Sequence, residues 1–476
     1  MFSKQIDMLS TLTPLPLAFL AFYFSWAMQV LIGNVAVGLV PYALLLMSAA
    51  WVSAKKMYRK KSQYGIRGIN SLDLFIGVFL LFSSCHALLA ITFGGYSISD
   101  GLRFFLVYVV TAWVYFYISR YARESEIRMV MVVIAIATVI VSIEWVYEVY
   151  SKLILHAVVG FQQKAAEYQV MRRDIADVRA DQLSLSSAFR SYGLFENYTV
   201  TGPMVALGAF ATLTLFSDAG RGKQLRVLVF FLIVQLVGMA TTSLVSYMII
   251  LPFVTGFLKP NWNIWKILKQ SMVAIMFFLI LITAILLMSR GNPITEFIVH
   301  NVTLQFDILT RLDESHGISW LGMYLDNLGW YADFIDKKMI AIFFGEGVLN
   351  YGYVTYDRGG DVGLLEFASA YGIPFVVLFL AVCFGALRRS ARSMKHDGMS
   401  KKQKMYMLFS FSAIAFCMLS LLHYDILFVK SVLVMFYLAL GLVRRYGYAR
   451  PVKIDQLRIA VAGKHLGDVE EYPAYQ

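Results

Sequence analysis

The residues best suited to chemistry lie in one long polar stretch between two apolar runs, residues 289–372. This stretch contains Arg290, Arg311, His316 and Asp361. A guanidinium group is always charged and forms paired hydrogen bonds with phosphate or carboxylate oxygens. An imidazole or a partly buried carboxylate can accept a proton. We therefore expect this stretch to be a place where an anionic group is bound and a proton is moved.

A second polar stretch, residues 151–199, adds Arg190 and Glu196. Its segment 167–182 is rich in charge and has no proline or glycine, which predicts a solvated helix. Arg190 comes just before an apolar run that begins near Val200. Two roles stay open for this arginine, which can bind an anion or anchor the end of a helix at a membrane surface.

The composition indicates that the chain folds in a membrane. Hydrophobic residues make up 59% of the chain and charged residues only 15%, which excludes an ordinary water-soluble domain. About twelve apolar runs are long enough to cross a bilayer. They lie near residues 14–32, 34–52, 72–94, 101–118, 129–150, 200–216, 225–239, 242–258, 270–288, 373–387, 405–422 and 426–442. The runs are continuous, so we expect one all-α polytopic membrane domain over residues 1–476.

The basic residues predict the orientation of the chain. Nearly all of them follow the even-numbered runs, which places those connections and both termini in the cytoplasm. Residues 443–476 then form a cytoplasmic tail, and residues 151–199 and 289–372 become two large loops on the outer side. The net charge of +12 is explained by this arrangement, so nucleic acid is not an expected partner. We find no cleavable signal peptide, and the three cysteines lie in apolar runs as buried hydrophobic residues.

The larger loop is expected to carry an amphipathic helix. Between Phe306 and Ile335, apolar side chains recur at helical spacing among Asp and Lys residues. Such a helix would lie on the outer leaflet, where it could cover a cleft that opens sideways to the bilayer. After it, Gly345-Glu346-Gly347 and further glycines form a turn-rich loop that delivers Asp361 to the next run.

Several local patterns recur together in a known group of proteins. Two short runs are joined at residues 240–243, and a Gly-x-Gly stands at 345–347. Asp361-Val362 is followed, nine residues later, by Gly372-Ile373-Pro374-Phe375, and Arg190 precedes Gly202 with eleven residues between them. With about twelve runs, these patterns resemble the O-antigen polymerase and O-antigen ligase superfamily.

The chain departs from the patterns of that superfamily at three points. The ligase motif has His where this chain has Asp361, which favours a polymerase. The spacing from Arg190 to Gly202 is one residue longer than in the polymerases. Thr242-Ser243 looks like the Thr-x-Ser-Arg turn of the superfamily, but Leu244 replaces its arginine.

The resemblance implies a bundle similar to GT-C glycosyltransferases, in the bacterial inner membrane. It implies polymerisation of undecaprenyl-diphosphate-linked oligosaccharide units at the periplasmic face, with no metal, no nucleotide sugar and no other cofactor. Membrane lipids, a flippase and a chain-length regulator are the other partners it suggests. Two alternatives stay open, an O-antigen ligase that transfers finished chains to lipid A core, and a flippase or other transporter of lipid-linked oligosaccharide.

The resemblance also implies roles for individual residues. The departing diphosphate needs positive charge, for which Arg190 and Arg311 are the first candidates and Arg290 a weaker one. The attacking hydroxyl needs a base, for which Asp361 fits the motif and His316 is the rival. Each has a structural alternative, since the arginines can anchor helix ends and Asp361 can cap the next helix.

Further candidates for substrate binding lie at the outer ends of the apolar runs. Arg103 and Lys430 each stand a few residues inside such an end, where a lone cation is unfavourable without an anion. Glu144 and Glu148 share one helix face and could pair with them, or could belong to a structural ion pair. Glu196, a third candidate for the proton acceptor after Asp361 and His316, is also a candidate for substrate binding. Tyr353 is one of several outer aromatic residues that could stack on sugars or form an interfacial belt.

Overall fold

A computed structural model describes most of the apolar runs and parts of the connections. The described ranges are 13–58, 70–93, 96–154, 160–173, 193–195, 198–238, 241–258, 362–422 and 426–447, together with 265, 269, 312–313, 317–318, 328–329, 331–333, 336 and 339–346. Within these ranges the chain is helical, apart from turns and one pair of two-residue strands. The all-α class predicted from the sequence is confirmed.

Six of the described helices are long and apolar enough to cross a membrane. They are α2 (Pro14–Ile32), η1 (Val35–Leu39) continuing into α3 (Val40–Tyr58), α4 (Ser71–Phe93), the helix from Ile98 to Tyr121, α7 (Glu124–Ile154) and α19 (Ile373–Met394). The helix from Ile98 to Tyr121 consists of α5 (Ile98–Phe104), η2 (Phe105–Val110), α6 (Thr111–Phe116) and η3 (Tyr117–Tyr121). The chain is therefore a membrane protein.

The remaining described helices are shorter or carry more charge. They are α8 (Phe161–Arg173), α10 (Tyr198–Thr214), α11 (Arg221–Gly238), α12 (Thr241–Phe257), α16 (Ala341–Phe344), α18 (Gly363–Tyr371), α20 (Lys401–Ser420), η6 (Ile426–Phe428) and α21 (Lys430–Tyr446). The predicted run at 270–288 lies outside the described residues. The total of about twelve spans therefore stays a prediction.

Local sequence explains where several helices begin and end. Pro14 opens α2, where a missing N–H has no consequence, and Gly33 closes it at φ 70°. Ser97 with Asp100, and Ser400 with Gln403, form reciprocal capping boxes at the starts of α5 and α20. These caps satisfy N–H groups that the first helical turn leaves unpaired.

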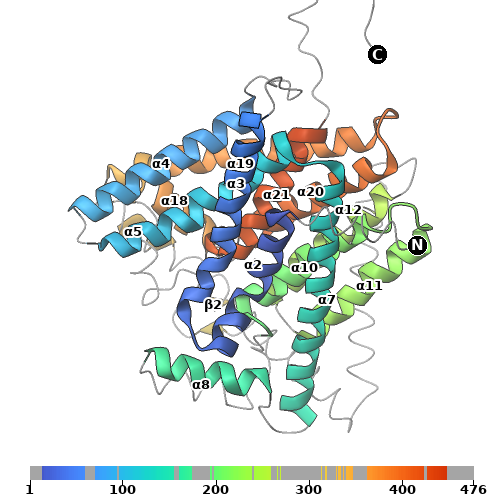
Figure 1. Cartoon of the computed structure of the whole chain (residues 1–476), viewed down its shortest axis with the longest axis horizontal. Helices are drawn as coiled ribbons and strands as arrows, with labels where there is room; N and C mark the ends of the chain where they lie inside the picture. Colours follow the sequence, from blue (N-terminus) through green and yellow to red (C-terminus); the bar gives the residue numbers. More distant parts are fainter. Residues whose placement is uncertain are drawn as a thin grey trace, which may run out of the picture.

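The two ends of the bundle differ in character. Helix α7 has 31 residues and spans about 46 Å, so it connects both ends (Figure 1). We call the end where α7 is followed by α8 the α8 end. There, Trp26 of α2 packs against Tyr168 of α8 with ring centroids 5.6 Å apart. We call the opposite end, where η3 leads into α7, the arginine end, because Arg120, Arg389, Arg444 and Arg445 lie near the ends of their helices there.

Helices α10 and α21 form the centre of the bundle. From Val200 to Thr214 every residue of α10 is buried, and α21 is buried from Ser431 to Val443. Helix α10 packs against α7, α20 and α11. The surrounding helices α3, α4 and α5 expose large apolar side chains, as expected of residues that face hydrocarbon rather than water.

The expected amphipathic helix from Phe306 to Ile335 is wrong in its first part. Leu312–Asp313 and Gly317–Ile318 are antiparallel strands β1 and β2, with Leu312 opposite Ile318. A pair this tight cannot lie inside a continuous helix. Gly317 helps to explain why the helix does not form here, because glycine disfavours a helix by about 1 kcal/mol relative to alanine. Among the described residues of this stretch, 328–329, 331–333 and 336 are helical.

Candidate functional site

Most of the predicted site residues lie outside the described residues, and two lie inside them. Arg103 is exposed on α5, and Lys430 is half-buried as the first residue of α21. The structure instead shows how the segments that carry the site residues are attached to the bundle. The predicted site residues that lie outside the described ranges are Arg190, Glu196, Arg290, Arg311, His316, Tyr353 and Asp361.

The segment that carries Arg190 is anchored three residues later, at Gly193. The N–H of Gly193 donates to Oε2 of Glu148 at 2.7 Å, and its carbonyl accepts from the side chain of Gln162. Gly193 has φ 56°, a conformation that glycine adopts without strain. This turn fixes the point at which the first polar stretch meets α7 and α8.

Glu148 also belongs to a buried ion pair. Its Oε1 lies 2.7 Å from Nζ of Lys152, and both side chains are only 1% exposed. Two buried charges are tolerated when their hydrogen bonds are satisfied, and here one carboxylate oxygen pairs with a cation while the other accepts the N–H of Gly193. A cation paired with Glu148 is thus Lys152 of the same helix, a partner that the sequence did not indicate. The expected pairing of Glu148 with Arg103 or Lys430 stays a prediction.

The segment that leads to the second motif is anchored by two glycines, Gly345 and Gly372. Both have positive φ, 68° and 85°. A Cβ atom on Gly345 would lie 2.3 Å from the backbone of α18, and one on Gly372 would lie 2.4 Å from the carbonyl oxygen of Phe343. The N–H of Glu346 donates to the carbonyl of Ser369 at 2.8 Å. Only glycine permits this direct contact of two backbones, which we call the glycine junction.

The nine residues inside the Asp361 motif form helix α18. Its N-cap residue is Val362, which makes no side-chain capping bond. Asp361 is the residue before this position and lies outside the described residues, so its two expected roles, base and cap, stay predictions. The N–H of Leu364 donates to the carbonyl of Leu421 at 2.8 Å, so the start of α18 is fixed on the end of α20.

Polar contacts link the two anchored segments across the bundle. Gln235 of α11 is fully buried. Its Nε2 donates to the carbonyl of Gly202 at 2.7 Å, and its Oε1 accepts from the hydroxyl of Ser243 at 3.1 Å. One turn further along α12, Ser246 lies 3.3 Å from Ser420 of α20, which precedes the carbonyl that holds α18. We call this series of contacts the polar path.

The polar path joins residues that the sequence patterns had singled out separately. Gly202 ends the Arg190 pattern, and Ser243, in the first turn of α12, belongs to the sequence segment expected to join two short runs. Gln235 was missed by the sequence reasoning, although a lone amide inside an apolar run is a signal in itself, because polar groups within a membrane are rare and usually paired. The path places the starts of α10 and α18 at fixed positions relative to each other.

Replacing Gln235 by leucine is expected to weaken the path. Two polar groups would lose their partner, and hydrogen bonds between membrane helices contribute about 0.6–1.7 kcal/mol. The free energy of unfolding should fall by about 1–2 kcal/mol, measured by denaturation in mixed micelles of rising sodium dodecyl sulfate content. Ser243→Ala removes one of the two bonds and should give a smaller loss. Equal stability of Gln235→Leu and the wild type would show that the path contributes nothing.

A substitution of Gly372 by alanine is expected to open the glycine junction. The backbone conformation at φ 85° and ψ 157° is nearly restricted to glycine and costs about 1–3 kcal/mol for other residues, and the clash with Phe343 adds to this. The midpoint of thermal unfolding in detergent should fall clearly. Gly385→Ala in α19 is the matched control, because nothing lies within 4 Å of its added Cβ. If both variants melt alike, the junction is not under this constraint.

An apolar cavity lies beside α18. Its walls come from α4, η2, α18, α19, η6 and α21, and aromatic rings dominate them. It has no charged group in its lining, so a sugar or diphosphate would not be stabilised there. The rings are those of Phe75, Phe79, Tyr108, Phe367, Phe379, Phe436 and Tyr437.

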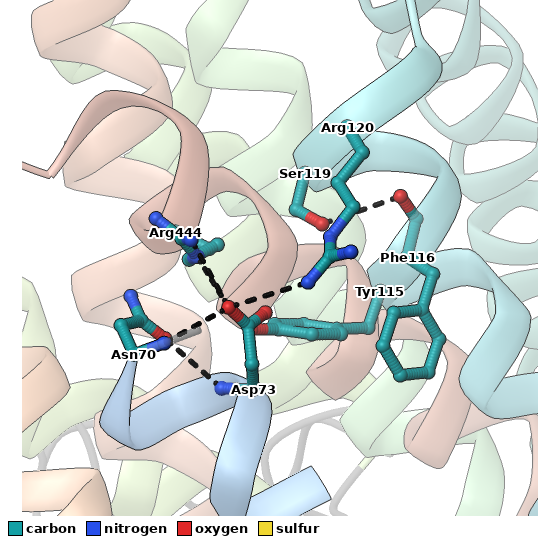
Figure 2. Close-up of polar contacts among 7 residues, drawn as sticks. All are labelled: Asn70, Asp73, Tyr115, Phe116, Ser119, Arg120 and Arg444. Carbon is teal, nitrogen blue, oxygen red and sulfur yellow. Dashed lines mark hydrogen bonds and ion pairs between the residues drawn. The ribbon is translucent and has the colours of Figure 1, made fainter. Parts of the chain in front are cut away.

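A further polar cluster lies at the arginine end (Figure 2). None of the sequence patterns indicated it. The carboxylate of Asp73, in the first turn of α4, accepts from Nε of Arg444 at 3.0 Å and from the hydroxyl of Tyr115 at 2.7 Å. Nη2 of Arg120 lies 3.5 Å from the same carboxylate. This cluster ties α4, α6, η3 and α21 together, far from the glycine junction.

Comparison with protein-family models and with curated proteins finds no match to this chain. Within the described ranges, no group of three or more His, Cys, Asp or Glu side chains could hold a metal ion. The expectation of a metal-independent reaction stays a prediction.

Proposed function

We propose that this chain is a membrane glycosyltransferase that polymerises polyprenyl-diphosphate-linked oligosaccharide units. The observation that carries the proposal is the polar path. It connects the start of α10, which follows the Arg190 segment, with the start of α18, which follows Asp361. A site built from both outer loops needs such a fixed relation between its two halves.

The proposed reaction assigns one task to each group. A hydroxyl of the acceptor sugar attacks the anomeric carbon of the donor, and the bond from that carbon to the diphosphate oxygen breaks. Asp361 takes the proton of the hydroxyl, with His316 as the rival base. Arg190 and Arg311 stabilise the negative charge on the departing polyprenyl diphosphate. Bonds and charge balance without a metal, a nucleotide sugar or a redox partner.

The remaining candidates are proposed to bind the substrate. Arg290, Arg103 and Lys430 would contact phosphate oxygens, and Glu196 and Tyr353 would contact sugar. The start of α21, which begins with Lys430, lies close to α18, because Leu427, Leu433 and Phe367 line the same cavity. This proximity favours Lys430 as a neighbour of the Asp361 segment.

The proposal includes an orientation in the bacterial inner membrane. The α8 end faces the periplasm, and the arginine end and both termini lie in the cytoplasm. Support comes from the basic residues of the arginine end. Arg388 and Arg389 lie near the end of α19, and Arg444 and Arg445 lie near the end of α21. Positive charge collects on the cytoplasmic side of membrane proteins.

An assay with the purified full chain separates the candidate functions. The protein in liposomes is incubated with polyprenyl-diphosphate-linked repeat units alone, and the products are separated by size. A ladder of longer lipid-linked chains is expected. Transfer that occurs only when lipid A core is added would replace the proposal by a ligase. Absence of both products would favour a flippase or other transporter.

A further inference from the structure

Several arginine side chains converge at the arginine end and share few buried carboxylates. Arg444 binds Asp73 through both Nε and Nη2 at 3.0 Å, and Arg445 donates to the carbonyl of Ile118 at 3.1 Å. Arg120 reaches the same Asp73. The buried carboxylate of Asp73 is thus shared by the guanidinium groups of Arg444 and Arg120. A third guanidinium group belongs to Arg445, the residue after Arg444.

A fourth guanidinium group, that of Arg389, joins this cluster from α19. Its side chain lies against the end of α21, because a Cβ atom on Gly447 would be only 2.7 Å from Cδ of Arg389. It is close enough to Arg444 to experience the charge of that residue. Within the described part of the chain, no carboxylate or carbonyl group accepts a hydrogen bond from the half-buried Arg389.

A second buried carboxylate at this end, that of Glu126 in the first turn of α7, is already occupied. Its Oε2 accepts the N–H of Arg123 at 2.7 Å, and its Oε1 accepts the hydroxyl of Tyr117 at 3.1 Å. Neither oxygen is directed to Arg389 by these contacts. The buried carboxylates described at this end, those of Asp73 and Glu126, are therefore both paired with groups other than Arg389.

We propose that Arg389 and Arg444 bind a phosphate group at the arginine end, supplied by the headgroup of an anionic phospholipid. Guanidinium groups match phosphate oxygens in geometry and charge. Basic pockets between membrane helices bind such headgroups, and each cation near the surface adds to the attraction. Asp73 positions Arg444 for this contact, and an incoming phosphate removes the repulsion between Arg389 and Arg444.

The geometry also explains why this site differs from a general basic surface. Asp73 is 3% exposed and Arg444 only 11%, so Arg444 is fixed by a buried partner rather than free to move in water. A fixed guanidinium loses less freedom on binding than a surface lysine. The inference does not depend on the proposed glycosyltransferase activity, and its test uses no sugar substrate.

The test is a calorimetric titration of the purified full chain in dodecyl maltoside micelles. The probes are dioctanoyl phosphatidylglycerol, dioctanoyl phosphatidylcholine and inorganic phosphate. Phosphatidylglycerol should bind more tightly than phosphatidylcholine, and Arg389→Gln should weaken its binding by roughly tenfold. Arg388→Gln, which removes the same charge from an exposed neighbour on α19, should leave binding unchanged.

Each outcome decides the proposal. Binding of inorganic phosphate with the same dependence on Arg389 would support the phosphate site and name free phosphate as a second source. Binding of phosphatidylglycerol alone would assign the site to the lipid headgroup. Equal weakening in Arg388→Gln and Arg389→Gln would reduce the effect to net charge and overturn the site. Lack of any preference for phosphatidylglycerol, with no binding of phosphate, would overturn it as well.

Discussion

Replacing Arg190 or Arg311 by alanine is expected to lower the rate of chain extension by roughly 10² to 10³ fold. The reason is the charge that develops on the diphosphate as its bond to the anomeric carbon breaks. Loss of one fixed donor to such an oxygen raises the barrier by about 2.7–4 kcal/mol in comparable reactions. The rate is measured from the appearance of the product ladder in liposomes.

The controls for these variants separate catalysis from folding. Arg190→Lys and Arg311→Lys keep the charge but lose the forked geometry, so they should recover only part of the rate. Thermal unfolding of all four variants should match the wild type. Arg221→Ala, at the start of α11, removes a basic residue that the proposal places on the cytoplasmic side, and should extend chains normally. Full activity of both alanine variants would remove these arginines from the site.

Replacing Asp73 by asparagine is expected to destabilise the protein by about 3–5 kcal/mol. The variant keeps the shape of the side chain but leaves Arg444 buried without its counter-charge. Breaking a buried pair by removing one partner is costly for this reason. Thermal unfolding in detergent, followed by the loss of the monodisperse fraction, measures the effect.

Arg120→Gln is the matched control for Asp73→Asn. Arg120 is 35% exposed and lies 3.5 Å from the same carboxylate, so its loss should cost about 0–1 kcal/mol. The double variant Asp73→Asn with Arg444→Met should recover stability relative to Asp73→Asn alone, because no unpaired buried charge remains. If Asp73→Asn melts like the wild type, the cluster does not hold the helix ends together.

The sequence predicted the helical architecture well because apolar runs are a local signal. The runs at 14–32, 72–94 and 129–150 correspond to α2, α4 and α7 within a few residues. The prediction failed at Leu312 to Ile318, where apolar spacing suited a helix but Gly317 and a tight strand pairing prevailed. The spacing of apolar residues alone does not show whether a helix will be interrupted by a turn or a strand pair.

The contacts of the candidate site could not be predicted from a single sequence. Arg103 and Lys430 were the cations considered for Glu148, yet the structure shows it paired with Lys152, four residues away on α7. Gln235 and Gly202 are 33 residues apart in the chain, and Asp73 and Arg444 are 371 apart. Such pairings follow from how helices pack, which hydropathy does not specify. The close approach of the two backbones at the glycine junction is of the same kind, although the glycines at 345 and 372 were visible in the sequence.

The most direct measurement of the central claim is photo-crosslinking of the full chain with a polyprenyl-diphosphate-linked donor that carries a diazirine on its first sugar. Labelled peptides are then identified by mass spectrometry. The account predicts labelling in both segments, the one around Arg190 and the one around Asp361, and loss of both labels when unlabelled donor competes. Labels confined to one of these segments, or found only on lipid-facing helices, would contradict a shared site formed by the two loops.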